Sequence, residues 1–207
     1  MKPTSAFESH YDAIIVGARC AGAATALLLA RQGARVLVVD WAAPGSDTMS
    51  THAVMRGAVV QLNRWGVLDS IIATGTPAIH TTTFQYGETV IPLALKPSHG
   101  VDALYAPRRT VLDKVLVDAA MQAGAEFRFG VSFRDVIRDP QERVVGAILG
   151  TSDAGPQEVR ADIVIGADGR RSSVARRVEA RTLRLAQNSI ACVFAYYDDI
   201  CDSGSHW

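Results

Sequence analysis

A glycine-rich turn between two apolar runs is the segment of this sequence best suited to chemistry. The apolar run at 12–16 leads into the turn at 17–22 (GARCAG), and a small-residue helical stretch follows at 23–31. A second apolar run at 35–39 then ends on Asp40. Strand, glycine turn, helix, strand and acid in this order form the βαβ pattern that binds ADP-containing cofactors. The segment therefore predicts a dinucleotide site.

Each residue type in this pattern has a physical reason to be there. Gly17 permits the tight turn off the strand, and Gly22 lets the helix pack closely against the strand. Ala18 belongs to the same turn, where free N–H groups at the start of the helix favour a pyrophosphate. The Asp40 carboxylate can accept hydrogen bonds from both ribose hydroxyls, and its charge would repel the 2′-phosphate of NADP.

Arg19 departs from the pattern because it occupies the place of the middle glycine. A cation at the start of a helix is disfavoured by the helix dipole unless an anion lies nearby. We therefore predict that the Arg19 side chain reaches toward the cofactor phosphates. The alternative is a solvated arginine beside a loosened phosphate contact.

The composition narrows the class of protein. The chain has 207 residues, of which 48% are hydrophobic and 20% are charged, as expected for one globular unit or one and a half domains. The net charge of zero argues against a nucleic-acid partner. The apolar runs are too short to span a membrane, and the N-terminus lacks a signal-peptide core. Cys20, Cys192 and Cys201 are widely spaced and odd in number, which predicts neither a metal site nor a disulfide framework, and favours a cytoplasmic location.

Periodicity and turn residues predict the other elements. Helices are expected at 56–65, 67–73 and 110–123. Two strands at 81–84 and 89–93 surround a turn and belong outside the doubly wound sheet. Further strands, including a β-meander that returns to a parallel strand, are predicted at 126–129, 132–138, 143–149, 158–160, 162–167 and 191–197.

A second acid–glycine turn follows the strand predicted at 162–167. Ligands of open α/β sheets lie at the carboxyl ends of the strands, so Asp168 can hold a ribose or order the pyrophosphate loop, while Gly169 permits close backbone approach. The alternative is an ordinary strand-to-helix turn. Arg108 and Arg109 precede the helix at 110–123, where an arginine can pair with phosphate. By themselves they would more often form a solvated patch.

Together, three motifs resemble a known family. They are Gly17-x-x-x-x-Gly22, Arg109-x-x-Leu112-Asp113 and Gly166-Ala167-Asp168-Gly169, in this order. The chain resembles FAD-dependent monooxygenases of the para-hydroxybenzoate hydroxylase type and the related geranylgeranyl-reductase-like oxidoreductases. Residues 47–52 and Arg19 look most like the reductase branch.

The resemblance runs from about Tyr11 to Val178 and implies an α/β fold. It implies a Rossmann-like FAD-binding domain with a β-meander at 11–75 and 101–178. It also implies a partial antiparallel-sheet substrate domain at 76–100 and 179–207.

The resemblance also implies the contacts of the cofactor. Gly17, Ala18, Arg19 and Gly22 would contact the pyrophosphate. Asp40, Trp41 and the Val131 backbone would contact the adenosine. Arg109 would lie on the flavin side, and Asp168 and Gly169 would lie near the pyrophosphate and the reducing nicotinamide. Arg19 has the flavin edge as an alternative partner. No metal is implied, and no residue is assigned as the catalytic acid or base.

The function implied is that of an oxidoreductase in which NAD(P)H reduces FAD. Hydroxylation, or reduction of a double bond in a small organic or isoprenoid substrate, would follow. The second Gly-Asp motif of these families does not occur before Trp207, so we expect either a truncated chain or a partner chain that completes the flavin site. A non-catalytic FAD-binding fragment is one alternative. An NAD-dependent dehydrogenase is another, which the Asp168-Gly169 motif after a β-meander disfavours.

Overall fold

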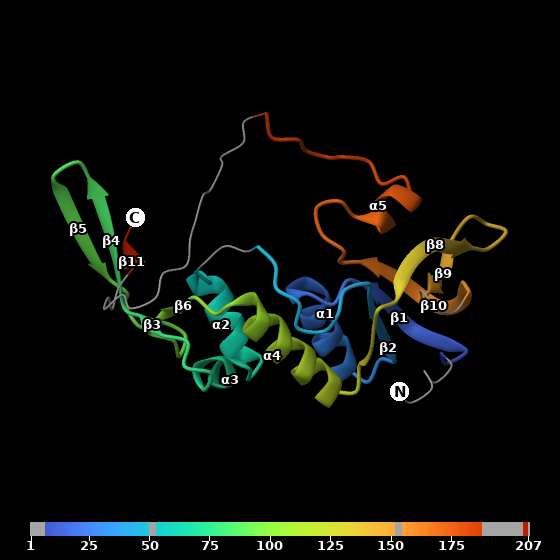
Figure 1. Cartoon of the computed structure of the whole chain (residues 1–207), viewed down its shortest axis with the longest axis horizontal. Helices are drawn as coiled ribbons and strands as arrows, with labels where there is room; N and C mark the ends of the chain where they lie inside the picture. Colours follow the sequence, from blue (N-terminus) through green and yellow to red (C-terminus); the bar gives the residue numbers. More distant parts are fainter. Residues whose placement is uncertain (1–6, 50–52, 152–154, 188–204, 207) are drawn as a thin grey trace. The chain divides into compact units, whose positions relative to one another are not determined.

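A computed structural model of the protein describes residues 7–49, 53–151, 155–187 and 205–206. The chain divides into two compact units (Figure 1). The first unit combines residues 1–50 with 108–180, and the second combines 51–107 with 181–207. These boundaries differ from those of the predicted domains, chiefly because 51–75 groups with the second unit. A compact unit need not be a functional domain, so the predicted division into a FAD-binding and a substrate domain stays a prediction.

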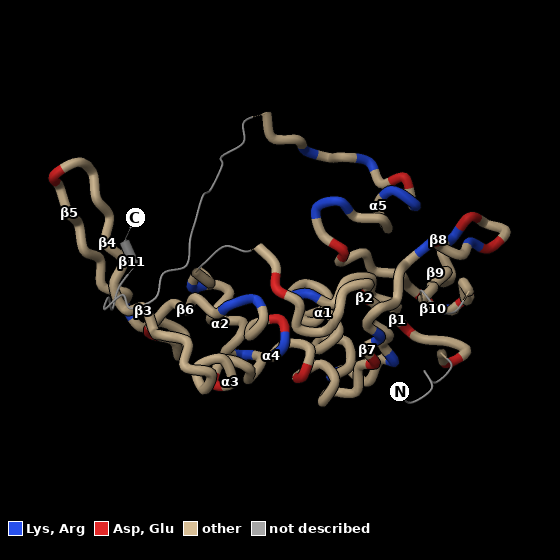
Figure 2. Tube along the Cα trace, in the orientation of Figure 1, with Lys and Arg blue, Asp and Glu red and all other residues tan. Residues whose placement is uncertain are grey.

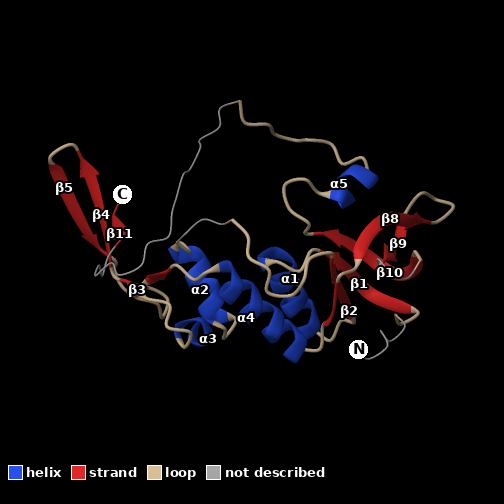
Figure 3. Cartoon of the chain, in the orientation of Figure 1, coloured by secondary structure: helices blue, strands red, loops and turns tan. Residues whose placement is uncertain are grey.

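The first unit is a sheet with helices against it (Figure 3). Its elements are β1 (His10–Val16), α1 (Cys20–Arg31), β2 (Val36–Asp40), α4 (Arg109–Gln122), β7 (Glu126–Phe129), β8 (Ser132–Arg138), β9 (Val144–Gly150), β10 (Gln157–Gly166) and α5 (Ser173–Arg177). The strand order is β7-β2-β1-β10-β9-β8. The α/β fold class with a mainly parallel centre is therefore confirmed.

The sheet changes direction within β10. Residues 160–166 of this strand pair in parallel with β1, whereas residues 157–160 pair antiparallel with β9. The sequence analysis predicted two separate strands here, at 158–160 and 162–167, and that division was wrong. Arg160 and Ala161 carry no turn signal, so the chain stays extended and one strand closes the β-meander while it joins the parallel sheet.

The central strands are buried on both faces. Every residue of β2 is buried, as is the second half of β1. On one face, Ile14 and Leu37 belong to an apolar core that also includes residues of β9 and β10. On the other face, α1 presents its buried alanines and Leu27 to the strands, and α4 packs beside α1. Parallel strands covered on both faces need such continuous apolar runs.

The second unit contains shorter elements. They are α2 (Arg56–Arg64), α3 (Leu68–Ile72), β3 (Ala78–Ile79), β4 (Thr81–Tyr86), β5 (Thr89–Ala94), β6 (Leu104–Tyr105) and β11 (Ser205–His206). The predicted hairpin is confirmed: β4 and β5 pair antiparallel around a turn at Gly87. All residues of β5 are exposed. The strand predicted at 191–197 lies outside the described residues.

Candidate cofactor-binding site

The turn between β1 and α1 requires glycine at two positions. Gly17 has a φ of +107°, and a Cβ there would lie 2.4 Å from the Ala167 carbonyl oxygen. A Cβ at Gly22 would lie 1.8 Å from the Gly17 carbonyl oxygen and 3.3 Å from Cγ2 of Ile15. The first turn of α1 therefore lies directly on the chain that leaves β1. The close helix–strand packing that the sequence predicted at Gly22 is present.

Asp40 ends β2 beside this turn, as the βαβ pattern requires. Its side chain is buried, with only 8% of the residue exposed. Oδ2 accepts a hydrogen bond of 2.8 Å from the Ala18 amide, and Oδ1 accepts one of 2.9 Å from the Ala42 amide. Each carboxylate oxygen can accept more than one hydrogen bond. Asp40 therefore keeps acceptor capacity for a further donor.

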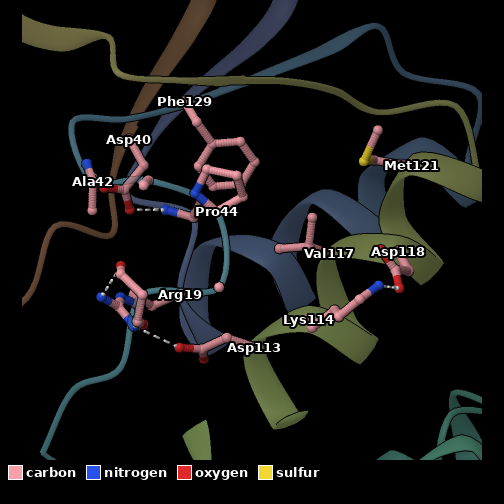
Figure 4. A pocket seen from close by; sticks show the side chains of 14 residues that line it. Arg19, Asp40, Ala42, Pro44, Asp113, Lys114, Val117, Asp118, Met121 and Phe129 are labelled. Carbon is pink, nitrogen blue, oxygen red and sulfur yellow. Dashed lines mark hydrogen bonds and ion pairs between the residues drawn. The ribbon is translucent and has the colours of Figure 1, made fainter. Parts of the chain in front are cut away.

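A cavity of about 390 Å³ opens in front of Asp40 (Figure 4). Its lining comes from the turn before α1, the end of β2 and the loop after it, one side of α4 and the end of β7. Val117, Met121 and Phe129 give it an apolar part. Its charged lining consists of Arg19, Lys114, Asp40, Asp113 and Asp118. Cavities of roughly 300–1,000 Å³ that combine an apolar lining with a few polar groups are typical of small-molecule sites.

Arg19 lies on the wall of this cavity, and its guanidinium group is held from two directions. Nη1 donates to the Ser46 carbonyl oxygen at 2.6 Å and to Oδ2 of Asp113 at 3.0 Å, while Nη2 donates to Oγ of Ser46 at 3.1 Å. The side chain is 30% exposed. The structure thus does not support the alternative of a freely solvated arginine.

Asp113 was not predicted as a site residue, yet it is the centre of a buried cluster. Only 6% of the residue is exposed. Besides Arg19, it binds Arg109 in a two-pronged ion pair, with a shortest separation of 2.9 Å, and Oδ1 accepts a hydrogen bond from the Cys20 thiol. The spacing of Arg109 and Asp113, one helical turn apart, was the available signal.

The Cys20 thiol is chemically quiet in this cluster. Burial, followed by the hydrogen bond to Asp113 and the charge of that carboxylate, raises the pKa of Cys20 to about 12. The reactive species of a cysteine is its thiolate. Cys20 therefore acts as a protonated donor to Asp113.

The Asp168 side chain binds the start of α5 at the second acid–glycine turn, next to the cap residue Ser172. Its Oδ2 accepts hydrogen bonds from the amides of Ser173 and Val174, and its Oδ1 is buried with no hydrogen-bond partner in the described structure. Gly169 has a φ of +83°, which suits glycine. Neither residue lines the cavity. The structure thus shows an ordering role in the turn, whereas contact with a cofactor stays a prediction.

The structure brings only part of the predicted site together. Ala18, Arg19 and Asp40 line the cavity, and Gly17 and Gly22 shape the turn beside it. Arg109 lies behind the wall, bound to Asp113. Trp41 is 78% exposed and does not line the cavity. Val131 is a core residue whose amide donates to the Asp40 carbonyl oxygen. Its backbone contact with adenine, like the other cofactor contacts, stays a prediction.

The comparison with known families decides the identity of this βαβ unit. Residues 10–194 match the family described as FAD binding domain. The chain belongs to this family. The match covers most of the chain and confirms the resemblance that the three motifs indicated.

Two curated proteins and one solved structure illustrate what this chain is similar to. The chain is 30% identical over 188 residues to aklavinone 12-hydroxylase RdmE of Streptomyces purpurascens, covering 81% of this chain and 34% of that protein. It is 30% identical to digeranylgeranylglycerophospholipid reductase 1 of Methanopyrus kandleri, covering 93% and 48%. A solved geranylgeranyl bacteriochlorophyll reductase-like protein of Thermoplasma acidophilum superposes with a TM-score of 0.72 at 25% identity, covering 86% and 44%. The chain thus spans less than half the length of these relatives.

Proposed function

We propose that this chain binds FAD through its ADP half and forms the cofactor-binding part of an NAD(P)H-using oxidoreductase. The observation that carries the proposal is the cavity between the glycine turn and α4, which places the Asp40 carboxylate and the Arg19 guanidinium on one wall. The match of residues 10–194 to the FAD binding domain family supports the same assignment.

The lining fits the chemistry of an ADP group. Asp40 retains acceptor capacity, so it can accept hydrogen bonds from ribose hydroxyls. Arg19 has more N–H donors than its three hydrogen bonds use, so it can donate to a phosphate. Val117, Met121 and Phe129 offer apolar contact to adenine. The first N–H groups of α1 have no partner within the helix, so a pyrophosphate can bind at the start of this helix.

The redox chemistry would come from the flavin itself. The residues of this chain contribute binding and orientation: Asp40 selects a ribose without a 2′-phosphate, and the turn at 17–22 fixes the pyrophosphate. Hydroxylation and double-bond reduction both remain within the proposal, since the relatives include a hydroxylase and a reductase. A small organic or isoprenoid substrate, a cytoplasmic location and completion of the flavin half by a second chain also remain proposals.

One observation favours a second candidate, FAD binding without turnover by this chain alone. The cavity is lined only by residues of the first unit, the unit that carries the glycine turn. Among the described residues no helix is long and apolar enough to cross a membrane, and no cluster of side chains suits a metal ion. An NAD-dependent dehydrogenase is disfavoured by the family match.

The test is to purify the whole chain, add FAD, remove the excess by gel filtration and record the visible spectrum. We expect a yellow protein with one FAD per chain. NADH or NADPH is then added without oxygen. Bleaching of the flavin absorbance supports the oxidoreductase, whereas bound FAD that neither nucleotide bleaches supports the binding-only candidate. A colourless protein would overturn both.

A further inference from the structure

Asp113 differs from the other carboxylates of the first unit in the number and kind of its partners. Both of its oxygens are occupied, by guanidinium N–H groups from Arg19 and Arg109 and by the thiol of Cys20. All of these donors approach a residue that is 6% exposed. Such a group cannot rotate to serve a ligand without leaving buried donors unpaired, which is costly.

The position of Arg19 depends on this carboxylate. Arg19 is the residue before α1, in an extended conformation, and its side chain extends across to α4 and to the loop after β2. Asp113 holds Nη1 from the α4 side, and Ser46 holds both terminal nitrogens from the loop side. In Figure 4 a dashed line joins the Arg19 guanidinium group to the Asp113 carboxylate at the cavity.

The two arginines that pair with Asp113 differ in their access to the cavity. Two guanidinium groups share one carboxylate, because both Arg19 and Arg109 pair with Asp113. The Arg109 side chain is only 16% exposed, whereas that of Arg19 is 30% exposed and lines the cavity. Arg19 is therefore the arginine of this pair that a ligand in the cavity can meet, and Asp47, which also interacts with Arg19, balances part of its charge.

We propose that Asp113 is the positioning residue of the phosphate subsite: it holds Arg19 so that the free N–H donors of this guanidinium meet the pyrophosphate of the cofactor. The inference rests on the proposed function. It assigns to Arg19 the role that the middle glycine of the dinucleotide pattern has elsewhere, with a fixed cation in place of a bare backbone. Asp113 itself touches no ligand.

The sign of one substitution separates positioning from charge balance. Asp113→Asn removes a negative charge near the phosphate site, so simple electrostatics expects tighter binding of an anion. A positioning role expects the opposite. The amide nitrogen of asparagine is a donor, and it would face the donors of Arg19, Arg109 or Cys20. Arg19 would lose its anchor, and binding of the pyrophosphate would weaken.

The experiment compares ADP with adenosine on the whole chain, by calorimetry, and reports the ratio of their two dissociation constants. Adenosine reads the ribose and adenine contacts alone, and ADP adds the phosphates. We expect ADP to bind more tightly than adenosine in the parent chain, and Asp113→Asn to reduce this preference by about tenfold or more, as loss of a charged hydrogen bond implies. Adenosine affinity should stay unchanged.

Asp135→Asn is the matched control, because Asp135 also pairs with an arginine, Arg177, in the same unit but outside the cavity. It should leave the ratio unchanged. If Asp113→Asn does not fold, Asp113→Glu decides the question, since it keeps the negative charge but moves the carboxylate away from the position that holds Nη1 of Arg19. A reduced ADP preference in Asp113→Glu, with adenosine affinity unchanged, supports the inference, and an unchanged preference contradicts it.

Different results would refute the proposed function and the positioning role of Asp113. A parent chain that binds neither ADP nor adenosine would refute the proposed function. A parent chain that binds both, together with an Asp113→Asn variant whose ADP preference is unchanged or increased, would refute the positioning role alone.

Discussion

Two buried aspartates on the same cavity, Asp40 and Asp113, are held in opposite ways. Both are almost fully buried, at 8% and 6% exposure. The hydrogen bonds to the Asp40 carboxylate come from backbone amides, and those to the Asp113 carboxylate come from two arginines and a thiol. The first carboxylate thus has only neutral partners, whereas two of the three residues that bind the second are charged.

The difference separates a residue that recognises from a residue that positions. Neutral amides orient Asp40 without cancelling its charge, so the carboxylate can still attract hydroxyl donors of a ligand. The charge of Asp113 is already compensated by Arg19 and Arg109, so a ligand gains little from it. Burial alone would not have told these roles apart, whereas the partners do.

The largest effect on binding and stability should come from the glycine turn at 17–22. This turn contains Ala18, which binds Asp40, and Arg19, which binds Asp113. We expect Gly22→Ala to abolish FAD binding and to lower the melting temperature strongly, because its Cβ would lie 1.8 Å from the Gly17 carbonyl oxygen. The Gly17 carbonyl oxygen belongs to the backbone, so it cannot move aside as the end of a flexible side chain could. Gly57→Ala, in α2, is the control: a Cβ there meets nothing within 4 Å, so stability should hold or rise. Equal melting temperatures in the two variants would contradict the close packing.

The second largest effect should be on stability, where alanine variants of the two aspartates should differ. We expect Asp113→Ala to lower the free energy of unfolding by about 3–5 kcal/mol, because it leaves two guanidinium groups near one another without a carboxylate. Asp40→Ala should cost only about 1–3 kcal/mol, for two unpaired amides. Urea unfolding monitored by circular dichroism measures both values. The reverse order would show that the roles are assigned to the wrong carboxylates.

For FAD affinity we expect the opposite order, with the larger loss at Asp40. Asp40→Ala should weaken FAD binding by about 1.5–3 kcal/mol for each ribose hydrogen bond lost, measured by fluorescence titration. Asp12→Ala is the control, because Asp12 lies at the other end of β1 and its carboxylate contacts Arg35. An Asp40→Ala variant with unchanged FAD affinity would mean that the ribose lies elsewhere.

The smallest effect concerns Cys20. Its pKa is raised to about 12, so at about pH 8 less thiolate is present than in the unfolded chain, where the ordinary value of 9.0 applies. We expect Cys20 to resist alkylation in the folded chain and to react after unfolding, as read by peptide mass spectrometry. Rapid labelling of the native protein would show that the thiol does not donate to Asp113.

The sequence predicted the local part of this arrangement well. The segment from β1 to Asp40 could be identified because its glycine turn, helix and acid follow one another within one βαβ unit. The family match confirms the interpretation of the three motifs. Periodicity could not show that β10 is one strand, since its first residues look like the end of a meander and its last like a parallel strand.

The contacts that hold Arg19 could not be predicted, because they join residues distant in sequence. Arg19 and Asp113 are 94 positions apart, and their pairing depends on how α4 packs beside α1. The position of Trp41 was equally out of reach. It follows the acid directly, but the side chain points into solvent and not over the cavity.

The most direct test of the central claim, that this chain holds FAD by its ADP half, is a comparison of FAD with FMN. Calorimetry on the whole chain should show FAD binding and no FMN binding, because FMN lacks the adenosine that would contact Asp40 and the apolar lining of the cavity. ADP should compete with FAD. Equal affinity for FMN and FAD, with no competition by ADP, would contradict the account.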